Sequence, residues 1–340
     1  MSFADGSGIT AETDGSGNGG IINIRASDSV ELSGVNPHGE NRFGFGTGLY
    51  VRSTGENENA GKGGDIVVES GSLSVTDGAV ITGTTLGRGQ GGRIALKVKE
   101  SVSISGDSSG TGQETPLMSQ NEFRESHPQT GEHSASGIYS RSESTAPSAG
   151  KAGEINLTAR NLTLPGKGKI TAEAKSAGGG KINVRAGNEI YILGGNITTS
   201  VRQGEGNGGD ITADSEFVIL NRSEITANAE EGDGGAIFIH TDNYIKSADS
   251  KITATSKRGN DGTVRIESPD TDISSDLVIL PGTLLDASRW MKTPCACRSA
   301  EKAGRFVIKG QDAMPTAFDD WQPSPLLWSE DKDDKKRRIK

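Results

Sequence analysis

The stretch that decides the fold runs from residue 180 to residue 199. It reads Gly180-Lys-Ile-Asn-Val184, then Ile190-Tyr-Ile192, then Ile197-Thr-Thr199. Its opening phrase is a glycine followed by a β-branched residue at the second position after it and an aliphatic residue at the fourth. The phrase begins at Gly20, Gly64, Gly92, Gly153, Gly180, Gly209, Gly235 and Gly262. The steps between these glycines are 44, 28, 61, 27, 29, 26 and 27 residues, so the basic repeat is about 27 residues long.

Each repeat contains three short runs in which aliphatic and polar residues alternate. In the repeat quoted above, the second run places Ile190 and Ile192 two residues apart, and the third begins at Ile197. Alternation with a period of two puts the aliphatic side chains on one face of a strand. Glycine, asparagine and aspartate lie between the runs and suit sharp corners, because they tolerate positive φ angles. Three strands and three corners make one turn, or rung, of a parallel β-helix.

The predicted fold class is therefore all-β, a parallel β-helix of about nine rungs with a C-terminal cap. A single rung cannot bury its aliphatic face, whereas stacked rungs can. A β-sandwich also contains many short strands, but it has no fixed three-strand period. The first β-branched residue of each repeat is expected to point inward. The predicted buried column consists of Ile22, Ile66, Ile94, Ile155, Ile182, Ile211, Ile237 and Val264.

The repeat divides the chain into three predicted parts. Residues 1–290 carry the β-helix, residues 291–328 have the aromatic and proline content of a cap, and residues 329–340 form a charged tail expected to be disordered. The run Ile9-Thr10-Ala11 already reads as a third strand, so the chain opens in the middle of a turn. Because a solenoid needs a cap at each end, we expect the chain to be the C-terminal piece of a longer protein.

Two of the steps between anchor glycines are much longer than 28 residues. They predict insertions near residues 34–47 and 107–136, both between the second and third strands of their rungs and therefore on one edge. Insertions on one edge of a solenoid often form its binding face, although loop growth is also tolerated at little entropic cost. The candidate partner-binding residues in these loops are Asn36, His38, Arg42, Phe43, Phe45, Phe123, His127 and His133.

Several other functions are disfavoured by composition. The net charge of −9 argues against nucleic acid as the main partner, and apolar runs of at most four residues exclude a membrane-spanning segment. The three loop histidines have no cysteine near them in the sequence, so no metal ligand is assigned. Gly-Gly-Asp at 63–65 and 208–210 is similar to part of a calcium-binding nonapeptide, but it occurs once per turn and favours a corner instead.

Two outward-facing columns were weighed for chemistry. Hydrolysis of a glycosidic bond needs paired carboxylates about 5–9.5 Å apart, and the outward positions of the first strand provide none on adjacent rungs. These positions are Asn23, Val67, Ala95, Asn156, Asn183, Thr212, Phe238 and Arg265. The third strand is expected to present an outward column of threonines that Tyr50 and Tyr139 interrupt. Its members are Thr10, Thr82, Thr171, Thr198, Thr226 and Thr253.

Several phrases resemble filamentous haemagglutinin-type exoproteins of bacterial two-partner secretion. The first is Gly17-Asn-Gly-Gly20 followed by Ile22-Asn-Ile-Arg-Ala26, and the C-terminal block is more specific. That block runs from Leu280-Pro281 through Cys295-Ala-Cys297 and Gly304-Arg-Phe-Val-Ile-Lys-Gly310 to Met314-Pro315. The resemblance covers about residues 8–325 and is closest to the C-terminal region of such proteins. The N-terminal secretion domain of that group has no match in this sequence.

The resemblance implies a right-handed parallel β-helix that is secreted to the bacterial cell surface and works as an adhesin-like shaft without a cofactor. Its expected partners are a host or neighbouring cell surface, matrix or glycan, and an outer-membrane transporter that would act on the missing N-terminal region. In that setting Cys295 and Cys297 become a candidate disulfide, although its small ring would be strained and a pair of small apolar residues in the cap is the simpler explanation.

The predicted function is thus a structural and adhesive shaft segment rather than an enzyme. The alternative is a polysaccharide-active β-helix enzyme, either a lyase or a glycoside hydrolase. One observation separates the two hypotheses: three or more outward carboxylates within ~8 Å of one another in one groove would favour the enzyme.

Overall fold

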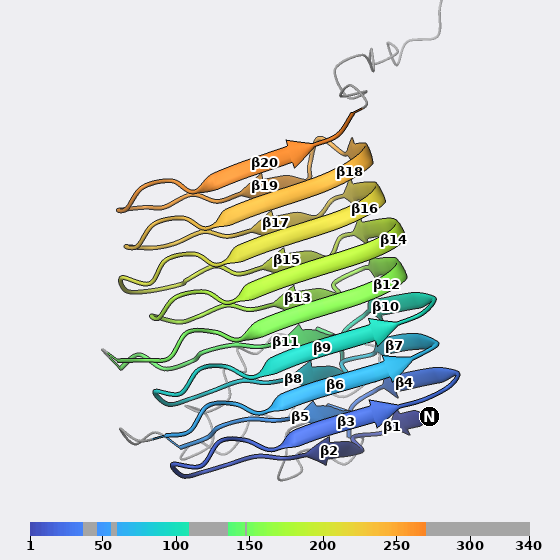
Figure 1. Cartoon of the computed structure of the whole chain (residues 1–340), viewed down its shortest axis with the longest axis vertical. Coiled ribbons are helices and arrows are strands. Elements are labelled where there is room, and N and C mark those ends of the chain that lie inside the picture. The colour runs from blue at the N-terminus through green and yellow to red at the C-terminus, as the bar shows by residue number, and fades with distance from the viewer. Residues whose placement is uncertain (37–45, 56–59, 109–134, 147, 270–340) are drawn as a thin grey trace, which may run out of the picture. The chain divides into compact units, whose positions relative to one another are not determined.

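The computed structural model describes residues 1–36, 46–55, 60–108, 135–146 and 148–269. These residues form an all-β solenoid of parallel strands, as the repeat predicts (Figure 1). The chain divides into two compact units, Met1–Val278 and Ile279–Lys340, and the second lies wholly outside the described residues. The predicted cap, the charged tail and the pair Cys295 and Cys297 therefore also lie outside them. About nine rungs were predicted, and the third strand recurs eight times in the described part.

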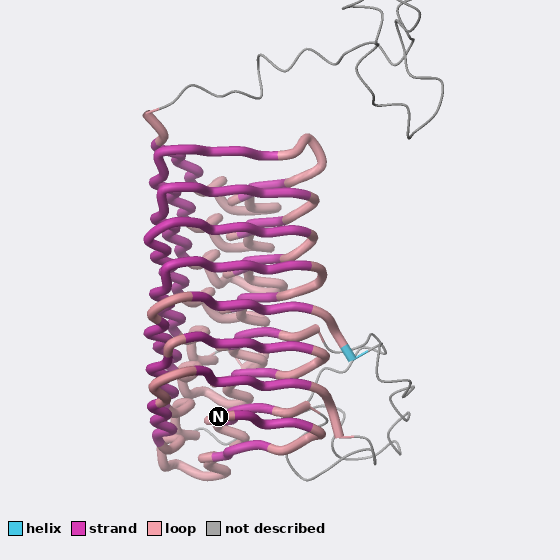
Figure 2. The backbone as a smooth tube through the Cα atoms, turned by 90° about the vertical axis from the view of Figure 1, so that its right-hand side faces the viewer, coloured by secondary structure: helices cyan, strands magenta, loops and turns pink. Residues whose placement is uncertain are grey.

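Each rung contributes three strand segments, which stack on the same segments of the neighbouring rungs (Figure 2). The first segments are β3 (Ile21–Arg25), β6 (Asp65–Ser70), β9 (Arg93–Val98) and β20 (Thr263–Glu267). The second segments are β1 (Ser2–Ala4), β4 (Ser29–Ser33), β7 (Ser72–Thr76) and β10 (Ser101–Ser105). In four rungs the first two segments form one bent strand, namely β12 (Glu154–Pro165), β14 (Lys181–Leu193), β16 (Asp210–Asn221) and β18 (Ala236–Lys246).

The third segments form a separate sheet of eight strands. They are β2 (Gly8–Thr10), β5 (Gly48–Tyr50), β8 (Val80–Thr82), β11 (Gly137–Tyr139), β13 (Lys169–Thr171), β15 (Asn196–Thr198), β17 (Glu224–Thr226) and β19 (Lys251–Thr253). The first and second segments together form a sheet of twelve strands, and every pairing between named strands in both sheets is parallel.

The interior is a set of aliphatic columns that run from rung to rung. The predicted column is confirmed from Ile22 to Ile237, whose seven members are all buried and lie opposite one another in register. Burial of each such side chain contributes roughly 1.5–3 kcal/mol. The prediction is wrong for Val264, whose side chain is 41% exposed. Val264 lies on β20, which pairs only with β18 among the described strands, so nothing described covers its other side.

The anchor glycines of the repeat are required by the close approach of consecutive rungs. A Cβ atom added at Gly209 would overlap the carbonyl oxygen of Gly180 on the rung before it. The same overlap relates Gly235 to Gly209 and Gly262 to Gly235. The corner between the third and first strands therefore admits only glycine at this position, which explains why the sequence phrase begins with it.

Candidate functional site

The two long connections both join a second strand to a third strand. The first runs from the end of β4 at Ser33 to Gly48, and the second runs from the end of β10 at Ser105 to Gly137. Each is closed at its base by an antiparallel bridge, Val35 to Gly46 in one and Asp107 to Ala135 in the other. The strand that follows each connection flanks β8, whose own connection is short, so the two connections leave the stack two rungs apart.

The same six-residue motif follows both connections. It reads Gly48-Leu-Tyr-Val-Arg-Ser53 in one rung and Gly137-Ile-Tyr-Ser-Arg-Ser142 in the other. The Tyr50 hydroxyl donates to the Gly46 carbonyl at 2.6 Å, and the Tyr139 hydroxyl donates to the Ala135 carbonyl at 2.7 Å. Each tyrosine thus holds the returning end of its own connection against the outside of the eight-stranded sheet. We call this duplicated arrangement the tyrosine root.

An arginine covers each tyrosine of the root. The guanidinium of Arg52 lies 5.0 Å from the centre of the Tyr50 ring, and that of Arg141 lies 4.2 Å from the Tyr139 ring. Such stacking is favourable because the ring face is electronegative. Burial raises the pKa of both tyrosines to about 12, and the neighbouring arginine opposes this with a smaller effect. Both hydroxyls therefore remain hydrogen-bond donors at neutral pH.

Carboxylates complete the root on both rungs. Arg52 pairs with Glu12 at 2.6 Å, and both side chains are largely buried. Glu143 is only 7% exposed and accepts two hydrogen bonds of 2.9 Å from Arg202. Ion pairs with buried carboxylates hold side-chain geometry more firmly than fully exposed pairs. The roots are therefore rigid platforms on a regular sheet.

The outward threonine column differs from the prediction. The register alternates Thr82 and Thr171 with Tyr139, as expected. Thr82, Thr171 and Thr198 are buried, whereas Thr226 and Thr253 are partly exposed and Thr10 is exposed. Thr82 and Thr84 share a hydrogen bond of 2.9 Å, and Thr198 bonds with Glu173 and Ser200. Thr226 donates to Thr198 on the neighbouring rung at 2.9 Å, so hydroxyls of this column bond with one another and with adjacent side chains.

Of the predicted loop residues, the structure describes one. Asn36 packs against the turn at Gly6, where an added Cβ atom would lie 2.5 Å from the Asn36 Cβ. The others lie outside the described residues, namely His38, Arg42, Phe43, Phe45, Phe123, His127 and His133. The tyrosine root itself was missed as a feature, although the two copies of Gly-x-Tyr-x-Arg-Ser are visible in the sequence.

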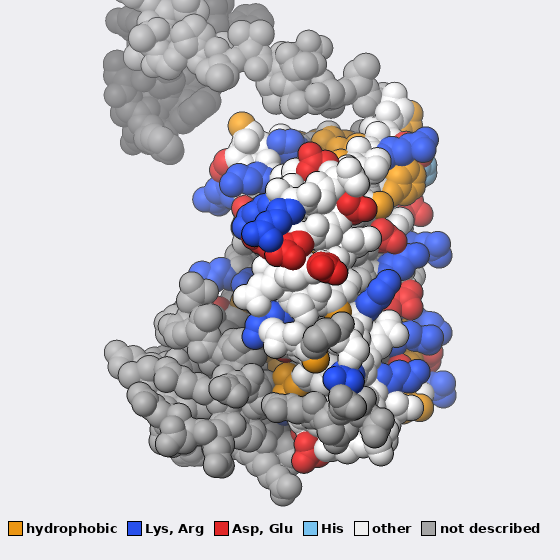
Figure 3. Space-filling view, turned by 90° about the vertical axis from the view of Figure 1, so that its left-hand side faces the viewer, with side chains coloured by type: hydrophobic (Ala, Val, Ile, Leu, Met, Phe, Trp, Pro, Cys, Tyr) orange, Lys and Arg blue, Asp and Glu red, His pale blue; other side chains and the backbone are white. Residues whose placement is uncertain are grey.

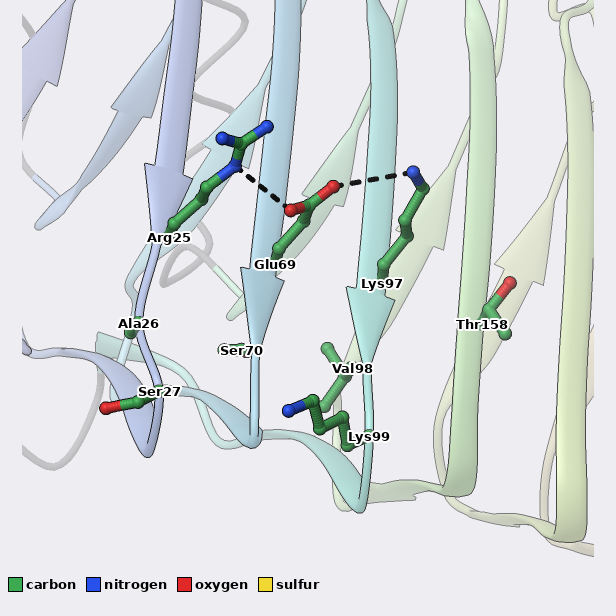
Figure 4. Close-up of a pocket in the computed structure, with 9 residues that line it drawn as sticks. All are labelled: Arg25, Ala26, Ser27, Glu69, Ser70, Lys97, Val98, Lys99 and Thr158. Atoms are coloured by element: carbon green, nitrogen blue, oxygen red, sulfur yellow. Dashed lines mark hydrogen bonds and ion pairs between the residues drawn. The ribbon is translucent and has the colours of Figure 1, made fainter.

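A second feature is a groove on the outside of the bend between first and second strand segments. Its lower part has a volume of about 610 Å³ and is lined by Arg25, Glu69, Lys97 and Lys99 above a floor that includes Ala26, Ser70 and Val98. Figure 4 shows Glu69 between Arg25 and Lys97, with ion pairs of 3.1 and 3.4 Å. The Ser70 hydroxyl is buried without a hydrogen-bond partner.

The groove continues past Thr158 into an upper part of about 510 Å³. Three carboxylates, from Asp214, Glu216 and Asp242, line this part together with Arg185 and His240. His240 Nδ1 lies 3.1 Å from the Asp214 carboxylate. Within the described ranges no group of His, Cys, Asp and Glu side chains is arranged to hold a metal ion. The sequence pattern does not predict this gathering of carboxylates, because they lie where the strands bend and not at the outward positions of the first strand.

The corners between third and first strands form a third hollow, with a volume of about 640 Å³. Glycine backbone provides most of its wall, from Gly178 to Gly180 and from Gly206 to Gly209. Figure 3 faces these corners and shows polar atoms and charged groups of both signs, with few hydrophobic side chains. Lys257 pairs with Glu230 and Arg258 with Glu231 here, which is typical of a solvated face.

Comparison with family models, curated proteins and solved structures finds no match for this chain. No helix among the described residues is long and apolar enough to cross a membrane.

Proposed function

We propose that this chain is the shaft segment of a secreted, surface-associated bacterial adhesin. The tyrosine root carries the proposal, because it recurs on two rungs and each time fixes the base of a long connection to the same face. An insertion without a function would not require an arrangement of this kind at its base, repeated on two rungs of the same chain. The stack supplies stiffness and spacing, and the connections supply recognition of a cell surface, matrix or glycan. The resemblance to two-partner secretion exoproteins supports the same function and the same location.

The test is a variant in which both connections are replaced by the short connection of the rung between them. Residues 34–47 and 106–136 each become Asp-Gly-Ala, the sequence at 77–79, because Ser33, Thr76 and Ser105 occupy equivalent positions in register. Tyr50→Phe and Tyr139→Phe are added so that no buried hydroxyl loses its partner. We call this protein the trimmed variant.

The proposal expects the trimmed variant to unfold as cooperatively as the parent chain, because the core columns are unchanged. On an array of glycans and matrix proteins, it should lose the binding that the parent chain shows. Equal binding by the two proteins would place recognition elsewhere, and loss of cooperative unfolding would show that the connections are structural.

A second candidate is a polysaccharide-active enzyme, which the three carboxylates of the upper groove favour. Asp214, Glu216 and Asp242 with Arg185 resemble in composition what cleavage of an acidic sugar chain requires, namely acid–base groups and a cation for the substrate. Release of reducing ends or unsaturated products from acidic polysaccharides, lost in Asp242→Asn without a change in melting, would support this candidate. Absence of turnover on such a panel would count against it.

A further inference from the structure

The groove at the bend carries one continuous column of mostly charged residues, one from each rung. In register order it reads Arg25, Glu69, Lys97, Thr158, Arg185, Asp214, His240, Glu267. Its length is about 34 Å at the usual spacing of roughly 4.8 Å between strands. The column is thus long enough for a protein interface. Because its charges follow one another in a fixed register, they define the charge pattern that a binding partner must have.

The charges are divided between the two parts of the groove. The lower part has three cations and one carboxylate, whereas the upper part has three carboxylates and one arginine. Lys99 in the lower part and Glu216 in the upper part are exposed and form no ion pair within the part of the chain that the structure describes. A ligand that fills the whole groove must therefore carry opposite charges at its two ends.

A second copy of the chain, turned to run antiparallel, meets this requirement. A two-fold axis between the rungs of β12 and β14 places two cations of the column, Arg25 and Lys97, opposite two of its carboxylates, Glu267 and Asp214. The resulting pairs are Arg25 with Glu267, Glu69 with His240, Lys97 with Asp214 and Thr158 with Arg185. Lys99 and Glu216, which follow Lys97 and Asp214 by two residues in the chain, then also face each other. A two-fold interface contains every such pair twice.

We propose that two copies of this chain associate antiparallel along this groove. For a column about 34 Å long, the ~800 Å² per partner of a standard interface requires contact over a strip about 24 Å wide. A uniformly acidic polymer fits less well, since the carboxylates of the upper part would repel it.

The test uses the full chain in the presence of a reductant, which prevents cysteine cross-links, and measures its mass by sedimentation equilibrium. The wild-type chain should form dimers whose dissociation constant rises with salt, as screening of charges requires. Lys99→Glu and Glu216→Lys should each weaken the dimer by ~10-fold or more, because each places like charges opposite one another twice. Neither substitution breaks an ion pair within the described chain, so the melting temperature measured on monomers, at concentrations well below the dissociation constant, should be unchanged.

The decisive sample is a mixture of the two variants. Two Lys99→Glu chains, or two Glu216→Lys chains, place like charges opposite each other at both contacts. One chain of each variant places opposite charges there instead. The mixture should therefore form heterodimers more tightly than either variant self-associates. A monomeric wild-type chain, or a mixture no tighter than the separate variants, would overturn the proposal. So would a monomer that binds dextran sulfate through Lys99, since the groove would then be a polyanion site.

Discussion

At the scale of single residues, the anchor glycines set the packing of the rungs. Gly209→Ala should destabilise the chain by about 2 kcal/mol or more, because the added carbon overlaps the Gly180 carbonyl and forces a backbone shift. Gly187→Ala is the matched control, because no atom lies within 4 Å of its Cβ position. Chemical denaturation of both variants measures the difference. Equal stability of the two would mean that the rungs are not as closely stacked as described.

The inward column makes a second prediction at this scale. Ile182 is fully buried, so Ile182→Asp should cost several kcal/mol and unfold the adjacent rungs, because a charge would be buried without a partner. Val264→Asp changes the same position of the repeat where the side chain is 41% exposed, and its cost should stay below about 1 kcal/mol. Similar losses in the two variants, read from denaturation midpoints, would contradict the register.

The buried tyrosines predict how stability changes at high pH. Burial raises the pKa of Tyr50 and Tyr139 from 10.0 to about 12. The folded state therefore holds these two protons more tightly than the unfolded state, and its advantage is full below pH 10 and is lost as pH rises from about 10 to 12. The Tyr50→Phe, Tyr139→Phe double variant should lose less stability in this window. An identical pH profile would show that neither tyrosine is buried.

At the scale of strands and connections, much of the architecture could be predicted from the sequence. The period-two pattern around Ile182 predicted the strand, its buried face and its stacking on neighbouring rungs. It could do so because the same pattern of aliphatic positions recurs in every rung. The prediction for Val264 is wrong because burial depends on what lies beyond a strand, which its own pattern does not contain. Thr82, Thr171 and Thr198 were expected to be exposed, and only the stacked rungs reveal that they are buried.

The groove could not be predicted from local patterns for a related reason. It lies where β12 and β14 bend, at register shifts between Ala159 and Asn161 and between Arg185 and Glu189. Such shifts change which residues meet across rungs, and no alternation marks them. His240 and Asp214 are 26 residues apart and meet only because the rungs stack in this register. The tyrosine root, in contrast, was readable as a repeated motif.

At the scale of the whole molecule, the regular stack separates stability from recognition. The core columns run the length of the described solenoid, and the two connections and the groove lie outside them. In a solenoid the stability of each rung depends mainly on its contacts with the neighbouring rungs. The connections on one edge can therefore change without loss of the fold. A protein built this way suits a role in which a stiff segment holds binding loops away from its attachment point.

The most direct test of the adhesive function is the affinity of three proteins for one immobilised ligand selected from the array, measured by surface plasmon resonance. The parent chain and the groove variant Asp242→Asn should bind with the same dissociation constant. The trimmed variant should bind at least ~10-fold more weakly, since a loss of 1.4 kcal/mol or more corresponds to that factor. The opposite order, with Asp242→Asn weakened and the trimmed variant unaffected, would place the function in the groove and contradict the adhesin proposal.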